Sequence, residues 1–204
     1  MNFDKLPFNW FDIALVIMLA VGISRGRKNG LSAELIGAFQ WLALVFGCAF
    51  AYEPVSELIT SSSSIFSVFS ANLLSYFAVA LIVGGLFAFL KKAAGGKLVG
   101  SDAFGNGEFY FGMLAGMIRF ACSMFVLLAL LNSRFFSSAE IKAELKYQNE
   151  VYGSDFFPSL YTVQSQVFEK SLTGPWIKKE LSWLLIKPTV PEQTQLARKE
   201  FSVP

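Results

Sequence analysis

Three charged residues lie within long apolar stretches, and these are the side chains whose types could do chemistry. Asp12 opens the first apolar run, Glu34 is the fourth residue of the second run, and Arg119 is the ninth residue of the fourth. Ionisable groups at such positions are costly in lipid, so they are usually paired or line an ion or substrate path. The three residues are therefore the candidate functional residues of the chain.

Asp12 has two interpretations. Asn9 precedes it by three residues, which is the spacing of a helix cap, and a carboxylate is favoured at the start of a helix. Trp10 beside it suits the interface between lipid and water. As a cap, Asp12 lies at the membrane edge; as a working acid, it faces a wet cavity. The sequence leaves both interpretations open.

Glu34 and Arg119 are expected to pair. If the runs are spanning helices, both residues enter from the same face of the membrane, at depths of about 5 Å and about 12 Å. The length of an arginine side chain closes that gap. Such a pair can be a purely structural clamp between two helices, or it can take part in transport or gating.

The composition excludes several chemistries. The chain has no histidine and two cysteines, Cys48 and Cys122, which both lie in apolar runs. Histidine-based triads and histidine metal sites are therefore impossible, and we expect no catalytic, metal or cofactor-binding residues. The net charge of +2 argues against a nucleic-acid partner, which requires a strong basic excess.

The elements that hold these residues are apolar and long. Hydrophobic residues make up 54% of the chain and charged residues 16%, against about 25% charged in a typical water-soluble domain. Apolar runs cover residues 8–24, 31–51, 72–90 and 111–132, and about 20 residues cross a membrane as a helix. These features predict an all-α, polytopic membrane protein with four transmembrane helices and a C-terminal helical, partly amphipathic tail.

The connecting segments predict the orientation. Lysine and arginine are concentrated in segments 25–30 and 91–110, whereas segment 52–71 contains neither. Positive charge in short loops stays on the cytoplasmic side. We therefore expect the N- and C-termini both to lie outside, which in a Gram-negative cell is the periplasm.

Four regions are predicted. They are an N-terminal flank (1–7), a membrane domain (8–132), an extramembrane or interfacial helical tail (133–188) and a disordered C-terminus (189–204). In the tail, Ser137 and Glu140 have the spacing of a capping box that opens a helix. Residues 175–186 are amphipathic and contain Trp176 and Trp183, so they can lie on the bilayer or pack against the rest of the tail.

Glycines mark where the helices are expected to approach each other. Gly22, Gly26 and Gly30 recur every four residues, and Gly112 and Gly116 have the same spacing in the fourth run. Small residues at this interval let helix backbones pack closely in a membrane. In the glycine-rich loop before the fourth run, we expect Asp102 to accept hydrogen bonds from backbone amides.

Several short motifs resemble the colicin V production protein (CvpA) family of bacterial inner-membrane proteins. The similar segments are NWFD at 9–12, RG at 25–26 with Gly30 and Glu34 following, VGSD at 99–102, FGMLAG at 111–116, and SDFFPSL at 154–160. The resemblance covers about residues 8–132. Ala103 and Ala115 stand where the family tends to have arginine, and Arg119, one turn beyond Ala115, can replace the second of these charges.

The resemblance implies a non-enzymatic accessory protein of the inner membrane that supports bacteriocin production or export and envelope homeostasis. The implied partners are the lipid bilayer, a membrane or secretion protein, and further copies of the same chain. The alternative is a small oligomeric channel or transporter in which Asp12, Glu34 and Arg119 line an aqueous path.

Overall fold

The computed structural model describes residues 8–63, 65–93, 105, 107–153 and 158–190. The helices are α1 (Trp10–Asn29), α2 (Leu31–Ser62), α3 (Val68–Ala93), α4 (Gly107–Asn132), α5 (Ser138–Tyr152), α6 (Leu160–Phe168) and α7 (Gly174–Glu180), followed by the 3-10 turn η2 (Ser182–Leu184). Within the described residues the only β pairing is an isolated bridge between Arg134 and Thr189. The prediction of an all-helical chain is confirmed.

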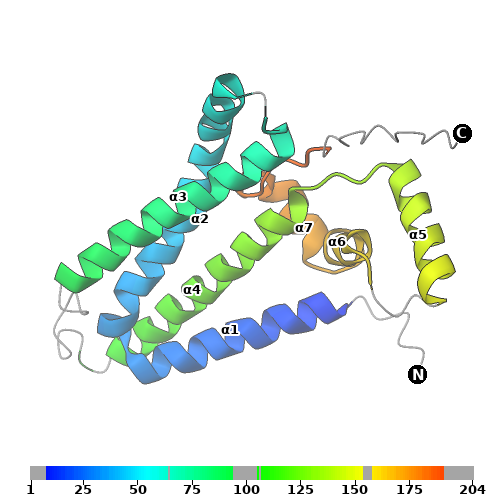
Figure 1. The fold of residues 1–204 in the computed structure, drawn as a ribbon. Coiled ribbons are helices and arrows are strands. Elements are labelled where there is room, and N and C mark those ends of the chain that lie inside the picture. Colours follow the sequence, from blue (N-terminus) through cyan, green and yellow to red (C-terminus); the bar gives the residue numbers. More distant parts are fainter. Residues whose placement is uncertain (1–7, 64, 94–104, 106, 154–157, 191–204) are drawn as a thin grey trace, which may run out of the picture.

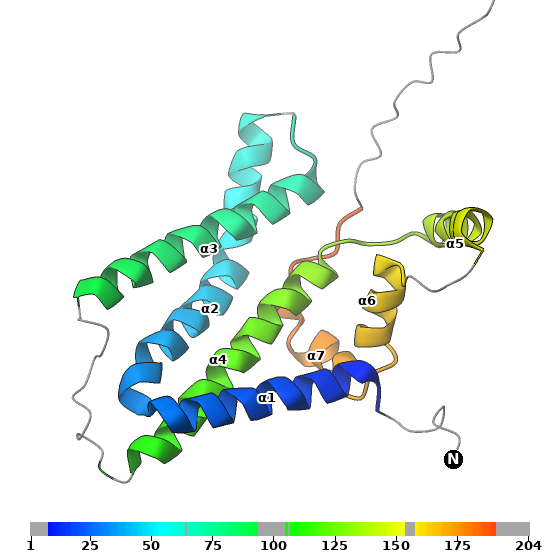
Figure 2. The same ribbon diagram turned by 60° about the horizontal axis from the view of Figure 1, so that its bottom comes forward.

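The four long helices pack in the spatial order α3, α2, α4, α1 (Figures 1 and 2). α1 and α4 meet near the end of α1 and the start of α4, and they diverge toward the other end. Helices α6 and α7 lie at that open end, beside the start of α1 and the end of α4 (Figure 2). Residues from the C-terminal third of the chain therefore complete the helical assembly.

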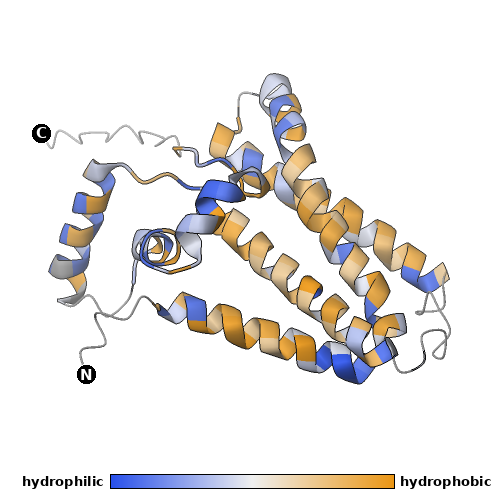
Figure 3. Cartoon of the chain, turned by 180° about the vertical axis from the view of Figure 1, so that it is seen from behind, coloured by the Kyte–Doolittle hydropathy of each residue, from blue (hydrophilic) through white to orange (hydrophobic). Residues whose placement is uncertain are grey.

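Among the residues that the structure describes, three helices are long and apolar enough to cross a membrane: α2, α3 and α4. Apolar residues cover most of their surfaces, whereas hydrophilic residues gather at the ends of α1 and in the tail (Figure 3). On α3, Leu81, Ile82 and Phe89 are at least 70% exposed. Large apolar side chains in such number are unfavourable in water, but lipid chains solvate them.

Helix α1 is not among the three helices of spanning character. Its uncharged part, between Asp12 and Arg25, is 12 residues long (13–24), or about 18 Å of helix. The hydrocarbon layer is about 30 Å thick. The fourth transmembrane helix, expected over residues 8–24, therefore stays a prediction.

Helix α2 continues well past its expected end at residue 51. It is 32 residues long, or about 48 Å, and it includes Pro54. Proline lacks the amide hydrogen that would bond to the carbonyl four residues earlier, which weakens the helix locally without ending it here. The last turns of α2 extend beyond the body of the molecule (Figure 1).

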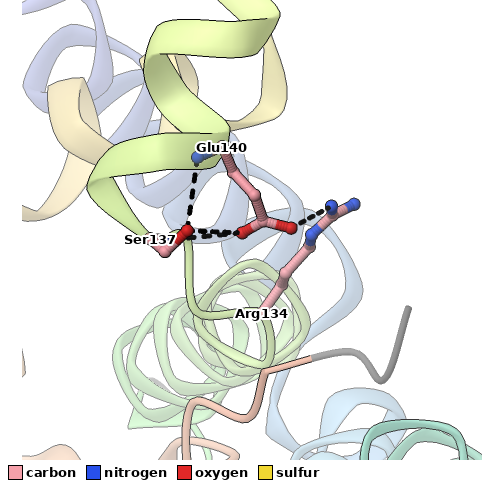
Figure 4. Close-up of polar contacts among 3 residues, drawn as sticks. All are labelled: Arg134, Ser137 and Glu140. Atoms are coloured by element: carbon pink, nitrogen blue, oxygen red, sulfur yellow. Dashed lines mark hydrogen bonds and ion pairs between the residues drawn. The ribbon is translucent and has the colours of Figure 1, made fainter. Parts of the chain in front are cut away.

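The tail begins with the predicted capping box. The amide of Glu140 donates to Ser137 Oγ at 3.2 Å, and the Glu140 carboxylate accepts from the Ser137 amide at 3.1 Å (Figure 4). Arg134 lies 3.8 Å from the same carboxylate. These contacts start α5 at Ser138, and they confirm the helix that the sequence predicts there.

The segment at 175–186 packs into the core of the molecule. Ile177, Leu185 and Ile186 are buried in one cluster with Tyr52 of α2 and Leu128 of α4. Lys178 and Lys179 face outward, as the amphipathic pattern predicts. The segment packs mainly against the long helices, and not only against the rest of the tail as the packing alternative had it. Its contact with the bilayer stays a prediction.

Disorder was expected from residue 189 onward, and this is wrong for Thr189. Its amide donates to the carbonyl of Ser133, and its carbonyl accepts from the amide of Phe135, both at 3.0 Å. Backbone hydrogen bonds do not depend on side-chain type, so they can hold an extended segment that no sequence pattern indicates. Residues 191–204 lie outside the described part of the chain.

Candidate functional site

Glu34 and Arg119 form the ion pair expected from their positions. Arg119 Nη1 donates to Glu34 Oε2 at 2.9 Å, and Glu34 is only 2% exposed. The side chain of Asn29, the last residue of α1, donates to the other carboxylate oxygen, Oε1. The three residues join the end of α1, the start of α2 and the middle of α4.

The arginine side chain runs over Gly37, a neighbour that the sequence analysis missed. A methyl group at Gly37 would lie 3.4 Å from Arg119 Nη1, so the guanidinium lies over the bare surface of this glycine. Gly37 is three residues after Glu34 and therefore on the same face of α2. The sequence signal for this contact was a glycine three residues after an acid within an apolar run.

The glycines of α1 and α4 bring the two backbones into direct contact. A methyl group at Gly22 would lie 2.8 Å from the carbonyl oxygen of Gly116, and one at Gly112 would lie 2.5 Å from the carbonyl oxygen of Gly26. Cβ atoms do not approach other atoms this closely. The antiparallel crossing of α1 and α4 therefore requires glycine at these four positions.

A second buried acid, Glu108, holds the α1–α2 junction. Its Oε1 accepts from the amide of Ser32 at 2.6 Å, which places a carboxylate at the N-terminus of α2. Gly30 has a φ of +74° and lies against the same carboxylate. A side chain at Gly30 would therefore be strained as well as crowded. The sequence analysis did not single out Glu108.

Asp12 holds the C-terminal tail against the start of α1. Its Oδ2 accepts from the amides of Leu172 at 2.9 Å and Asn9 at 3.1 Å. Its Oδ1 accepts from the amide of Thr173 at 3.1 Å and from Thr173 Oγ1 at 2.7 Å. The capping box expected with Asn9 is present. The same carboxylate thus caps α1 and binds the turn before α7, a contact the sequence did not predict.

The surroundings of Asp12 favour its charged form. Burial alone would raise the pKa of this carboxyl group, but hydrogen bonds from Leu172, Asn9 and Thr173 outweigh burial and hold the pKa below its usual value. All four hydrogen bonds are made to the ionised group. Asp12 is a structural acid in this geometry, because both of its oxygens are already engaged.

The tryptophans make different contacts. The indole N–H of Trp10 donates to the side chain of Gln166 in α6, and Trp183 stacks on Phe50 with ring centroids 5.8 Å apart. Phe50 belongs to α2 and is 70% exposed, so Trp183 lies on the outer, apolar side of that helix. Trp176 is exposed. Asp102 lies outside the described residues.

The charged candidates do not form one site. Asp12 is in the first turn of α1. Glu34 is hydrogen-bonded to Asn29, which is the last residue of α1. Asn29 is 17 positions after Asp12, which corresponds to about 26 Å of helix. Within the described residues, no three histidine, cysteine, aspartate or glutamate side chains gather as metal ligands. Two separate polar clamps, one at each end of α1, describe the arrangement.

This architecture, with several apolar helices of spanning length joined by buried polar clamps, defines a multi-pass helical membrane protein. The family model described as colicin V production protein matches residues 11–165. The chain belongs to this family. The match includes α5 and most of α6, so it extends beyond the 8–132 region in which most of the similar motifs lie. Comparison with curated proteins gives no match, and comparison with solved structures gives none.

Proposed function

We propose that this chain is a non-enzymatic accessory protein of the bacterial inner membrane that supports the production or export of colicin V-type toxins and the integrity of the envelope. The family match over residues 11–165 carries this proposal. The family is one of production proteins and not a known family of enzymes. The apolar helices α2, α3 and α4 suit a protein that acts within the membrane.

The geometry of the buried acids supports an assembly role. Glu34 uses both carboxylate oxygens to hold Asn29 and Arg119, and Asp12 uses both to hold Asn9 and the turn before α7. A general acid or base needs an oxygen that can reach a substrate proton. Groups engaged in this way position helices, and a precisely held helical surface is what a partner protein or a second copy recognises.

A toxin-secretion assay tests the proposal. The host carries the colicin V genes and lacks its own member of this family, and secreted toxin is measured as the zone of killing on a sensitive lawn. Expression of the chain should restore the zone. The variant Gly26→Leu, which disrupts the crossing of α1 and α4, should fail, whereas Gly84→Ala should restore it because Gly84 has open space around it. An unchanged zone, with the wild-type chain present in the membrane fraction, would reject the proposal.

Ion flux separates this role from the channel alternative. The purified chain is reconstituted into vesicles that contain a pH-sensitive dye, and a proton gradient is applied. An accessory protein should give no flux above that of empty vesicles. Flux that is abolished by Glu34→Gln and retained in Gly84→Ala would support the channel and contradict the accessory role.

The proposed orientation places both termini in the periplasm. The basic ends of α1 and α3, with Arg27 and Lys92, lie opposite the end that holds the tail (Figure 2). Single cysteines at Phe8, Ser63 and Lys92 can be probed in spheroplasts with an impermeant maleimide, since Cys48 and Cys122 are buried. Positions 8 and 63 should react from outside, and position 92 only after permeabilisation. Protection of position 8 would show that α1 does not cross.

A further inference from the structure

A groove of about 720 Å³ lies beside the crossing of α1 and α4. Ser24, Arg27 and Lys28 line it from the last turns of α1. Phe109, Tyr110 and Met113 line it from the first turns of α4. Its origin is geometric. Because glycines let the two backbones touch, the large side chains that flank the contact must splay apart, and they enclose a hollow.

The cations of the groove have no protein counter-ion in the described part of the chain. Arg27 and Lys28 are exposed and form none of the ion pairs observed there. No acidic side chain is among the described residues that line the groove. Arg27 and Lys28 are adjacent and repel each other. The negative end of the α1 dipole offsets part of this positive charge, and an anion bound between the two side chains would offset more of it.

The other wall of the groove is apolar and aromatic. Phe109 and Tyr110 are 54% and 71% exposed, and they lie in the first turn of a spanning helix. Aromatic rings are typical of the level at which lipid head groups meet acyl chains. A positive wall next to an aromatic wall at that level matches an amphiphile with a negative head and a hydrocarbon tail.

We propose that this groove binds one anionic phospholipid. The phosphate lies between Arg27 and Lys28 and accepts hydrogen bonds from them, with the Ser24 hydroxyl as a further donor. The acyl chains run along Phe109 and Met113 and down the outer surface of α4. The bound lipid neutralises the two cations and fills the hollow beside the glycine contact, so it braces the α1–α4 crossing. The site is independent of the proposed role in toxin production.

Native mass spectrometry of the full chain tests this site. The protein is released from mixed bilayers of phosphatidylglycerol and phosphatidylcholine, and the lipids that remain bound are counted. The wild-type chain should retain one phosphatidylglycerol with a preference of about thirtyfold over phosphatidylcholine, as expected for two cations near the head group. The double variant Arg27→Gln/Lys28→Gln should lower that preference to near one. Added inorganic phosphate should not displace the lipid, because it offers nothing to the apolar wall.

Two controls separate a site from general attraction to a negative surface. Lys91→Gln/Lys92→Gln removes the same charge from the end of α3 and should leave the preference unchanged. Ser24→Trp keeps every charge but fills the groove, and it should abolish the preference. Equal losses in the two charge variants, a preference that survives Ser24→Trp, or the absence of any preference in the wild-type chain would each overturn the proposal. Thermal unfolding in detergent confirms that each variant is folded.

Discussion

Gly26 of α1 and Gly112 of α4 lie backbone against backbone, so that neither position has room for a methyl group. This contact is the narrowest point between two helices that diverge toward their other ends (Figure 2). The arrangement of the tail follows from it, because α6 and α7 pack at the open end of these two helices. Substitution at the contact should therefore affect distant parts of the molecule.

Gly26→Leu should lower the free energy of unfolding by about 3 kcal/mol, at the upper end of the cost of overpacking. The reason is that its Cβ would overlap the carbonyl group of Gly112. Thermal unfolding in detergent, followed by circular dichroism, measures the change. Gly85→Ala is the matched control because nothing lies within 4 Å of the added methyl group, and it should shift stability by no more than about 0.5 kcal/mol. Equal losses in the two variants would contradict the close-contact interpretation.

Glu34 and Arg119 should behave as a unit. Arg119→Ala leaves a buried carboxylate with only Asn29 as partner, and Glu34→Ala leaves an arginine without its counter-ion. Each single variant should lose up to about 3 kcal/mol of stability, the scale for breaking a buried pair, because Glu34 is buried although the Arg119 side chain is 36% exposed. The double variant should be no worse than either single variant, because no charge is then left unpaired. Losses that add in this double-mutant cycle would reject the coupling.

The contact between Asp12 and the tail should depend on pH. Asp12 lies outside the three spanning helices, and its folded-state pKa is lower than the ordinary value of 3.8. Its stabilising contribution is therefore present above about pH 4 and is lost as the pH falls through the folded-state pKa. Hydrogen exchange at the amides of Leu172 and Thr173, corrected for the intrinsic rate, should accelerate under acid.

Asp12→Asn is the control for this effect. An amide side chain keeps one acceptor oxygen but carries no charge to lose, so exchange at Leu172 and Thr173 should be faster than in the wild-type chain and nearly independent of pH. Exchange at the amide of Lys187, which donates to the Tyr52 hydroxyl at 3.1 Å, is an internal reference that does not involve Asp12. A wild-type chain in which the protection of Leu172 and Thr173 does not fall under acid, down to the lowest pH at which the chain stays folded, would contradict the assignment.

Trp183 should report the depth of the tail. It stacks on Phe50 and also lies 5.8 Å from Phe46, both on the outer side of α2. Lipids brominated along their acyl chains should quench its fluorescence when the other three tryptophans are replaced by phenylalanine. A chain that retains only Trp176, which is exposed, is the comparison and should be quenched less. The opposite order would place Trp183 away from the lipid.

Sequence reasoning succeeded where the physical signal is local or periodic. Apolar length predicted the spanning helices α2, α3 and α4, and the spacing of Ser137 and Glu140 predicted the start of α5. The pairing of Glu34 with Arg119 also followed from depth alone, because two opposite charges at similar depth in lipid have few other partners.

Sequence reasoning failed where the signal is a contact between distant segments. Asp12 and Thr173 are 161 residues apart, and no periodicity connects a helix start to a turn in the tail. The extension of α2 past Pro54 was missed for another reason. Glu53 and Glu57 follow an apolar run and therefore resemble charges in a loop. A helix can continue beyond the membrane, however, because its backbone hydrogen bonds are kept and its charged side chains lie on its surface.

The burial of Ile177, Leu185 and Ile186 against Tyr52 and Leu128 sets an order of assembly. A ribosome delivers α1 to α4 to the membrane before it has made these residues. The apolar side chains that they cover are therefore still uncovered at one end of the nascent bundle. Helices α6 and α7 and the residues after them cover these side chains after insertion. In a chain released before residue 174, these apolar side chains would stay uncovered. Quality-control proteases that survey the membrane would recognise this end of the bundle first.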